Sequence, residues 1–217
     1  WKHYNLNVQS TRPNDHQGLF FGYSGVNGIS DLMEVDTREI PVNLAFLMYL
    51  NNPGPNYWRT VPTGQILDSY RSHGIQAVAV FENFLFESII DPSSPCIRAD
   101  DGQRVKYRRR LDWLYRLDEF VTLHGQHFNP QDVAMILMQS EVNDRCADMD
   151  EVVEAATEVR QRFPAIPLAL SYGASYDQYG GRVSQPAPSE FPEIFDYIGV
   201  FSYRILIVNL PLEPRNA

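Results

Sequence analysis

Five stretches of this chain repeat one pattern: a short apolar run, a polar or aromatic residue at its C-terminal edge, and then a segment with helix-like spacing. The runs cover residues 42–50, 75–81, 133–138, 166–170 and 197–201. Near-continuous apolar runs of this length are typical of strands buried on both faces, as in a parallel sheet covered by helices. In such folds the functional side chains lie at the C-terminal ends of the strands. The residues that close each run are therefore the first candidates for a site.

A further strand is predicted at 19–23, which gives six strand–helix units in order. Residues 1–17 are polar and irregular and form an N-terminal arm, whereas 18–217 form a single domain. Two architectures fit: a (β/α)8 TIM-type barrel, complete or truncated at its C-terminus, and an open doubly wound sheet. The barrel is favoured because polar residues recur at strand ends and no glycine-rich nucleotide fingerprint follows the first strand. Eight units normally take about 250 residues, so the last two are missing or compressed.

The segments between the strands predict four helices: one between Pro62 and Gly74, one over about 107–124, one that begins near Asp148, and a short one near 189–195. The segment 84–106 is predicted to be a long loop. Loops of this length inside a compact domain are often lids or binding loops.

Composition excludes two classes of partner. The chain is 44% apolar and 21% charged, and no apolar run approaches the roughly 20 residues that span a bilayer, so we expect a soluble protein without a membrane partner. The net charge of −9 argues against nucleic acid, which requires a clustered basic surface. The one basic run, 108–110, is expected on a solvated helix face. The oligomeric state stays open.

Cysteine usage leaves the compartment open. Cys96 and Cys146 are too few for a disulfide framework; they would pair in an oxidising compartment, but two unrelated thiols fit equally well. The chain starts at Trp1 without a signal-peptide pattern, which predicts a processed form or a fragment. Secretion is one of the localisations that fit.

The residues at the strand ends exclude several chemistries. The two lysines, Lys2 and Lys106, lie outside the strands, which argues against a Schiff base. No Walker or dinucleotide motif is present, so no cofactor is expected. A histidine-based metal site is not expected either, because none of the five histidines closes a strand; they are His3, His16, His73, His124 and His127.

Carboxylates at two strand ends are what remains. Glu82 closes the run 75–81, and Glu141 follows the run 133–138. A bare carboxylate after a buried strand is costly unless it is solvated, paired or functional. The alternative is that each glutamate caps a loop or meets an arginine such as Arg145. Two acids on adjacent strand ends favour a site.

Aromatic and amide side chains at or near the strand ends suit a sugar ligand. Aromatic faces stack on the apolar faces of sugar rings, and amides bind hydroxyls. The alternative is that some tyrosines only cover the top of the core, which we prefer for Tyr49. The candidate substrate contacts are Tyr23, Asn51, Trp58, Asn83, Asn143, Tyr172 and Tyr203.

The segments 134–141, 168–172 and 195–203 together resemble the (β/α)8 glycoside hydrolases. In that superfamily a glutamate that closes the fourth strand is the general acid/base, so the resemblance implies this role for Glu141. Members with an Asn-Glu pair have asparagine at the position of Ser140. Chitinase-like members have aspartate at the position of Gln139. The chain meets neither subfamily pattern.

The resulting hypothesis is a glycosidase that acts on a poly- or oligosaccharide. Glu141 protonates the glycosidic oxygen, and a second carboxylate stabilises or attacks the oxocarbenium-like centre. Glu82 is the best candidate for the second carboxylate, with Asp144 and Glu87 as weaker choices. The alternatives are a catalytically inactive carbohydrate-binding or scaffold barrel and a carboxylate-using lyase or isomerase.

Overall fold

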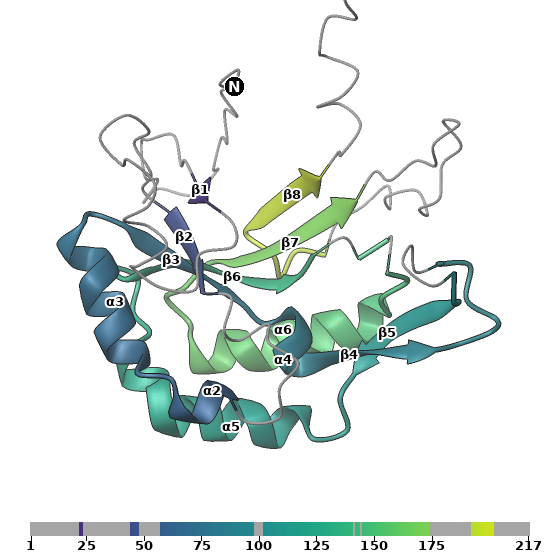
Figure 1. Cartoon of the computed structure of the whole chain (residues 1–217), viewed down its shortest axis with the longest axis horizontal. Coiled ribbons are helices and arrows are strands. Elements are labelled where there is room, and N and C mark those ends of the chain that lie inside the picture. Colours follow the sequence, from purple (N-terminus) through teal and green to yellow (C-terminus); the bar gives the residue numbers. More distant parts are fainter. Residues whose placement is uncertain are drawn as a thin grey trace, which may run out of the picture.

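The computed structural model describes residues 22–23, 44–47, 57–97, 102–140, 142–143, 145–173 and 192–201. Its main element is a six-stranded parallel sheet with the strand order β1-β2-β3-β6-β7-β8 (Figure 1). The strands are β1 (Gly22–Tyr23), β2 (Leu44–Leu47), β3 (Gln76–Val80), β6 (Val133–Gln139), β7 (Leu168–Gly173) and β8 (Tyr197–Phe201). Each strand falls at a position where the sequence predicts one, and every pairing in this sheet is parallel. The predicted parallel sheet is confirmed.

The helices are α2 (Tyr57–Thr60), α3 (Thr63–Ser72), α4 (Glu82–Leu85), α5 (Trp113–His124), the 3-10 helix η2 (Gly125–His127) and α6 (Met149–Arg162). Gly74 follows α3 with a left-handed φ of 71°, a conformation that glycine adopts without strain. The Asp148 side chain accepts hydrogen bonds from the backbone N–H groups of Asp150 and Glu151 and so caps α6. Residues 192–195, part of the short helix expected near 189–195, are not helical in the structure.

The order in which the strands are added to the sheet distinguishes barrel-type winding from a doubly wound sheet. Strand numbers increase steadily across the sheet, so successive right-handed crossovers place their helices on the same face. Figure 1 shows α3, α5 and α6 together on one side of the sheet. A doubly wound sheet reverses its strand order and carries helices on both faces. The described sheet is therefore wound in one direction; it is open, with β1 and β8 as its two edges.

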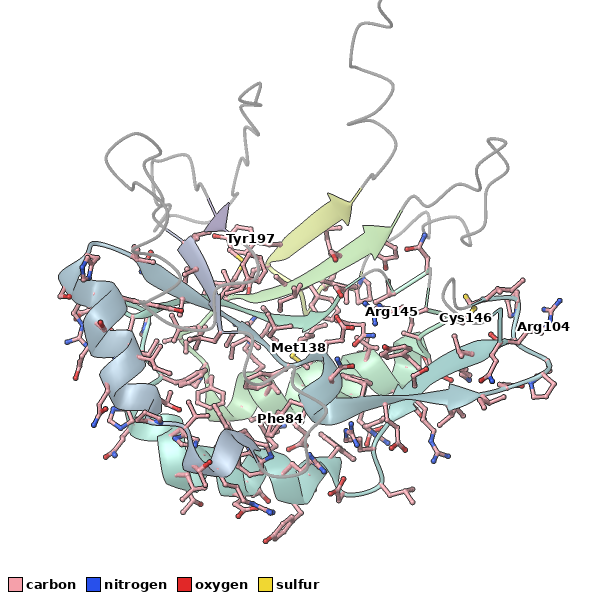
Figure 2. The ribbon with its side chains drawn as sticks, in the orientation of Figure 1. Phe84, Arg104, Met138, Arg145, Cys146 and Tyr197 are labelled. Carbon is pink, nitrogen blue, oxygen red and sulfur yellow. A yellow bond between two sulfur atoms is a disulfide. The ribbon has the colours of Figure 1, made fainter. Side chains whose placement is uncertain are left out.

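Strands β2, β3, β6 and β7 carry buried side chains on both faces of the sheet. On the helix side lies an aromatic cluster, in which the rings of Trp58, Phe81 and Phe84 meet Phe120 and Phe128 at centroid distances of 5.0–6.4 Å. The opposite face carries a smaller apolar cluster of Leu44, Val78, Val80, Ala134, Leu137 and Ala169. Figure 2 shows the contrast: Phe84 and Met138 lie on the helix side and Tyr197 on the other. This two-sided burial explains why the strands have near-continuous apolar sequences.

The expected loop over 84–106 is wrong. The last two residues of α4 lie in this segment, and β4 (Phe86–Ile90) follows and pairs antiparallel with β5 (Val105–Arg109) in a sheet of its own. The predicted helix over 107–124 accordingly begins only at Trp113. The hairpin was missed because its strands are short and partly exposed, with Glu87 and Ser88 interrupting β4 and three basic residues in β5, so neither has the apolar run of a main-sheet strand.

The basic run 108–110 also differs from the expectation of a solvated helix face. Arg108 lies opposite Glu87 on the hairpin and pairs with it at 3.0 Å. Arg109 pairs with Glu154 on α6 at 2.6 Å. These arginines therefore connect the hairpin internally and to α6.

An ion pair between half-exposed Arg71 and buried Asp132 joins α3 to the start of β6. The Asp132 side chain is 2% exposed and receives Arg71 Nε at 2.5 Å, Arg71 Nη2 at 2.8 Å and Asn129 Nδ2 at 2.7 Å. Such two-pronged, charge-assisted contacts are among the stronger hydrogen bonds in proteins. Asp68 contacts the same arginine at 3.0 Å, but its side chain is 71% exposed.

We predict that Asp132→Asn lowers the free energy of unfolding by about 2 kcal/mol, because it weakens the charge-assisted hydrogen bonds made to a buried carboxylate. Asp68→Asn removes the exposed contact to the same arginine and should cost at most about 0.5 kcal/mol. Urea unfolding of both variants measures the difference. Equal losses would contradict a special role for the buried carboxylate of Asp132.

His124 makes stability depend on pH. Burial lowers the pKa of His124 from the ordinary value of 6.5. Its Nε2 atom lies 2.9 Å from the carbonyl oxygen of Trp58. Below pH 6.5 the unfolded chain therefore takes up this proton before the folded protein does, so the free energy of unfolding falls until the pH passes the pKa of the folded state. His124→Gln should flatten this decline, whereas the exposed-site control His73→Gln should not. Urea unfolding between pH 7.5 and pH 5 measures both slopes.

Candidate active site

The C-terminal edge of the parallel sheet brings together the residues that follow its strands. Glu82 comes two residues after β3, and Ser140 comes directly after β6. Because β3 and β6 are neighbours and run parallel, these two positions meet at the same edge. This edge is where open and closed parallel α/β folds carry their functional residues.

Glu82 is 1% exposed and has contacts to both of its carboxylate oxygens. Oε2 accepts hydrogen bonds from the Ser140 hydroxyl and, at 3.3 Å, from the Ser140 backbone N–H. Oε1 lies 2.6 Å from Nη1 of Arg145. The ion pair with Arg145, one of the roles left open by the sequence, is thus what the structure shows for Glu82. Glu141 and Asp144 lie outside the described residues.

Arg145 is itself held by the hairpin. Its Nη1 donates a hydrogen bond to the Tyr107 hydroxyl at 2.5 Å, and its guanidinium carbon lies 4.9 Å from the centroid of the Tyr107 ring. The Tyr107 backbone N–H donates to the Arg145 carbonyl at 3.1 Å. Tyr107 is in β5, so Arg145 connects the hairpin with the edge of the main sheet.

A disulfide secures the same connection. Cys96 lies between β4 and β5, Cys146 follows Arg145, and the two form a disulfide with a Cα–Cα distance of 5.8 Å. This answers the pairing that the sequence left open. Cys146 has a φ of 49°, a left-handed value that is uncommon for a residue other than glycine. In Figure 2, Arg145 and Cys146 lie between the main sheet and the hairpin.

The predicted aromatic contacts divide into two groups. Trp58 is 3% exposed, with its ring 5.1 Å from Phe84 and under the guanidinium of Arg59. Tyr172 is also buried in the helix-side cluster, and this burial raises the pKa of its hydroxyl. Both rings are therefore part of the core. Tyr23 is described only as part of β1, and Tyr203 lies outside the described residues.

Two of the three predicted amide contacts lie among the described residues. Asn143 is buried in the segment after β6. Asn83 is half-buried in α4, and its backbone carbonyl accepts a hydrogen bond from Arg110 at 3.1 Å. Asn51 lies outside the described residues. The structure thus brings Glu82 and Asn143 to the edge of the sheet where β6 ends.

Gln139, which sequence reasoning did not select, closes β6 with its side chain fully buried. Neither its amide nitrogen nor its amide oxygen has a hydrogen-bond partner in the described part of the chain. The pairing of β6 with β7 shifts register between Leu137 and Gln139, and such bulges are common beside active sites. A buried amide without partners costs stability. The sequence signal that could have singled out Gln139 is its position at the end of an otherwise apolar run.

A pocket of about 430 Å³ lies between the hairpin and the N-terminal end of α6. None of the predicted ligand contacts lines it; its walls include Asp91, Ser93, Lys106, Cys146 and Asp148. The two charges of Lys106 and Asp148 pair at 3.2 Å across this region.

Two further properties concern only the described residues. They contain no cluster of histidine, cysteine and acidic side chains with which a metal ion could be bound. None of their helices combines the length and the apolarity that a bilayer crossing requires.

The described chain is thus a mixed α/β protein with a parallel sheet wound in one direction. No protein-family model matches the chain, and no curated protein does either. Among solved structures, it is similar to the Thermobacillus composti GH10 xylanase, with a TM-score of 0.39 and 13% sequence identity, over 71% of this chain and 47% of that one. The chain therefore spans about half the length of the xylanase. At this TM-score the likeness assigns neither an architecture nor an activity.

We predict that Gln139→Met raises the free energy of unfolding by about 1 kcal/mol, because it removes a buried amide that has no compensating hydrogen bond. The control is Gln131→Met at an exposed position just before β6, which should change stability by less than about 0.5 kcal/mol. Thermal and urea unfolding measure both. A clear loss of stability in Gln139→Met would mean that the amide has a structural partner.

Proposed function

We propose that this protein is a glycoside hydrolase that cleaves a poly- or oligosaccharide, with Glu141 as the general acid/base. The observation that carries the proposal is the set of contacts that Glu82 makes. Glu82 accepts hydrogen bonds from Ser140, directly before Glu141 in the sequence, and pairs with Arg145, shortly after it. The buried carboxylate of Glu82 thus contacts residues on both sides of the proposed acid in the sequence.

A physical reason connects this arrangement with catalysis. A general acid must hold its proton in line with the departing oxygen, and small displacements of a catalytic group reduce the rate strongly. A catalytic group needs support from neighbours that are themselves locked by packing and hydrogen bonds. Ser140 and Arg145 are locked in this way through Glu82 and Tyr107.

The proposed reaction requires a second carboxylate. Glu141 would donate its proton to the glycosidic oxygen, while the second carboxylate would attack the anomeric carbon or activate a water molecule. Glu87, one of the weaker choices, pairs with Arg108 and Arg110 on the hairpin. The sequence names Glu82 first for this role and Asp144 as a further choice.

We further propose that the whole domain is a (β/α)8-type barrel. Its support is the steady strand order with helices on one face, which is how the strands of such a barrel are wound. In a closed barrel of this kind, the face that carries Leu44, Val78 and Leu137 would be the interior.

A second candidate function is carbohydrate binding without catalysis. It is favoured by the occupied oxygens of Glu82 and by the burial of Trp58 and Tyr172 in the core. Binding of oligosaccharides without turnover by the unmodified protein would identify this case.

The test of the proposal is Glu141→Gln, assayed with phenyl and 2,4-dinitrophenyl glycosides of common hexoses and pentoses. Loss of the acid should reduce kcat/KM for the phenyl glycoside by about 100-fold or more. The dinitrophenyl glycoside should lose much less, because its leaving group needs no proton. The control is Glu193→Gln, an exposed glutamate far along the chain. Full activity of Glu141→Gln on the phenyl glycoside would refute the assignment.

A further inference from the structure

The β4–β5 hairpin departs from the regular alternation of strand and helix. It lies in the connection from β3 to β6 and forms a separate two-stranded sheet. Yet it contacts the segment after β6 through the disulfide of Cys96 with Cys146 and through both the side chain and the backbone of Tyr107. These contacts converge on Arg145 and its neighbour Cys146.

The contacts continue from Arg145 to the end of β6. Its guanidinium lies 2.6 Å from Glu82, and Glu82 accepts hydrogen bonds from the side chain and the backbone N–H of Ser140. Since Glu82 is 1% exposed, its negative charge depends on Arg145 for compensation. An unbroken series of covalent, ionic and hydrogen bonds thus leads from the hairpin to the residue that precedes Glu141.

We propose that Glu82 and Arg145 are positioning residues for the acid/base Glu141, and that the hairpin and its disulfide hold them in place. This inference rests on the proposed function. It assigns Glu82 a supporting role, and the second carboxylate of the reaction is then a different residue. It also makes the hairpin a part of the catalytic apparatus.

The geometry of Glu82 argues for support and against contact with substrate. A nucleophile or general base needs an oxygen that can reach the anomeric carbon or a water molecule. Both oxygens of Glu82 are instead engaged by Ser140 and Arg145, and almost none of the residue is exposed. Breaking the pair would leave a buried charge and release the end of β6.

The first experiment measures kinetics in Arg145→Gln and in the double variant Cys96→Ser with Cys146→Ser, with the same two aryl glycosides. We expect kcat to fall by about 10- to 100-fold, as for a displaced catalytic group, with KM unchanged. The phenyl glycoside should be affected more than the dinitrophenyl glycoside, because the displaced group is the acid. Arg145→Lys, which keeps the charge, should recover part of the loss.

The matched control is Arg162→Gln, which removes an arginine–aspartate ion pair of 2.6 Å between α6 and Asp118 of α5, outside the hairpin and the end of β6. It should leave kcat unchanged. Thermal unfolding of every variant verifies that it is folded at the assay temperature. If Arg145→Gln does not fold, Arg145→Lys and the disulfide variant carry the test.

The second experiment asks whether Glu82 touches the sugar. In Glu82→Ala, added azide can replace a missing carboxylate that contacts the anomeric carbon, giving a glycosyl azide. We expect no rescue of kcat and no glycosyl azide. Azide rescue would overturn the inference and make Glu82 the nucleophile or base.

The outcomes separate the two claims. If the unmodified protein cleaves no aryl glycoside or oligosaccharide, the proposed function fails and this inference fails with it. If the protein is active, the inference alone fails when Arg145→Gln has unchanged kinetics, when only KM rises, or when both glycosides lose activity equally.

Discussion

A buried carboxylate and one arginine hold this site together. Glu82 follows β3, one of the two central strands, and has almost no exposed surface; such a charge is stable only with a close partner of opposite sign. Arg145 provides that partner at 2.6 Å. Because Arg145 belongs to the segment after β6, the ion pair also fixes that segment against β3. The requirement to compensate one buried charge therefore determines how two strand ends are joined.

The rest of the fold makes this pairing possible. The one-directional winding of the sheet places β3 beside β6, so their C-terminal ends meet although the hairpin and α5 separate them in sequence. The aromatic cluster of Phe81, Phe84 and Phe120 anchors α4, which begins at Glu82. The hairpin then supports Arg145 from its other side through Tyr107 and the disulfide.

The sequence predicts those strands that are buried in the structure and therefore have apolar sequences. The strands of the main sheet are of this kind. The start of α6 is predicted for another reason, because Asp148 is a helix-capping residue. The hairpin was not predicted, because polar and charged residues interrupt its short strands, and ion pairs and a disulfide contribute to holding it. The sequence named Arg145 as a possible partner for a glutamate. It could not decide whether the glutamate would pair with this arginine or act on a sugar. It could not place Trp58 in the core either, because an aromatic residue suits a core and a ligand surface equally.

The most direct test of the central claim is a double-mutant cycle on kcat with Glu82→Gln, Arg145→Gln and the two combined. If the two residues act as a unit that holds the end of β6, the double variant should be no slower than the slower single variant. Losses that add in full would show that Glu82 and Arg145 act separately. Such additivity would contradict the account.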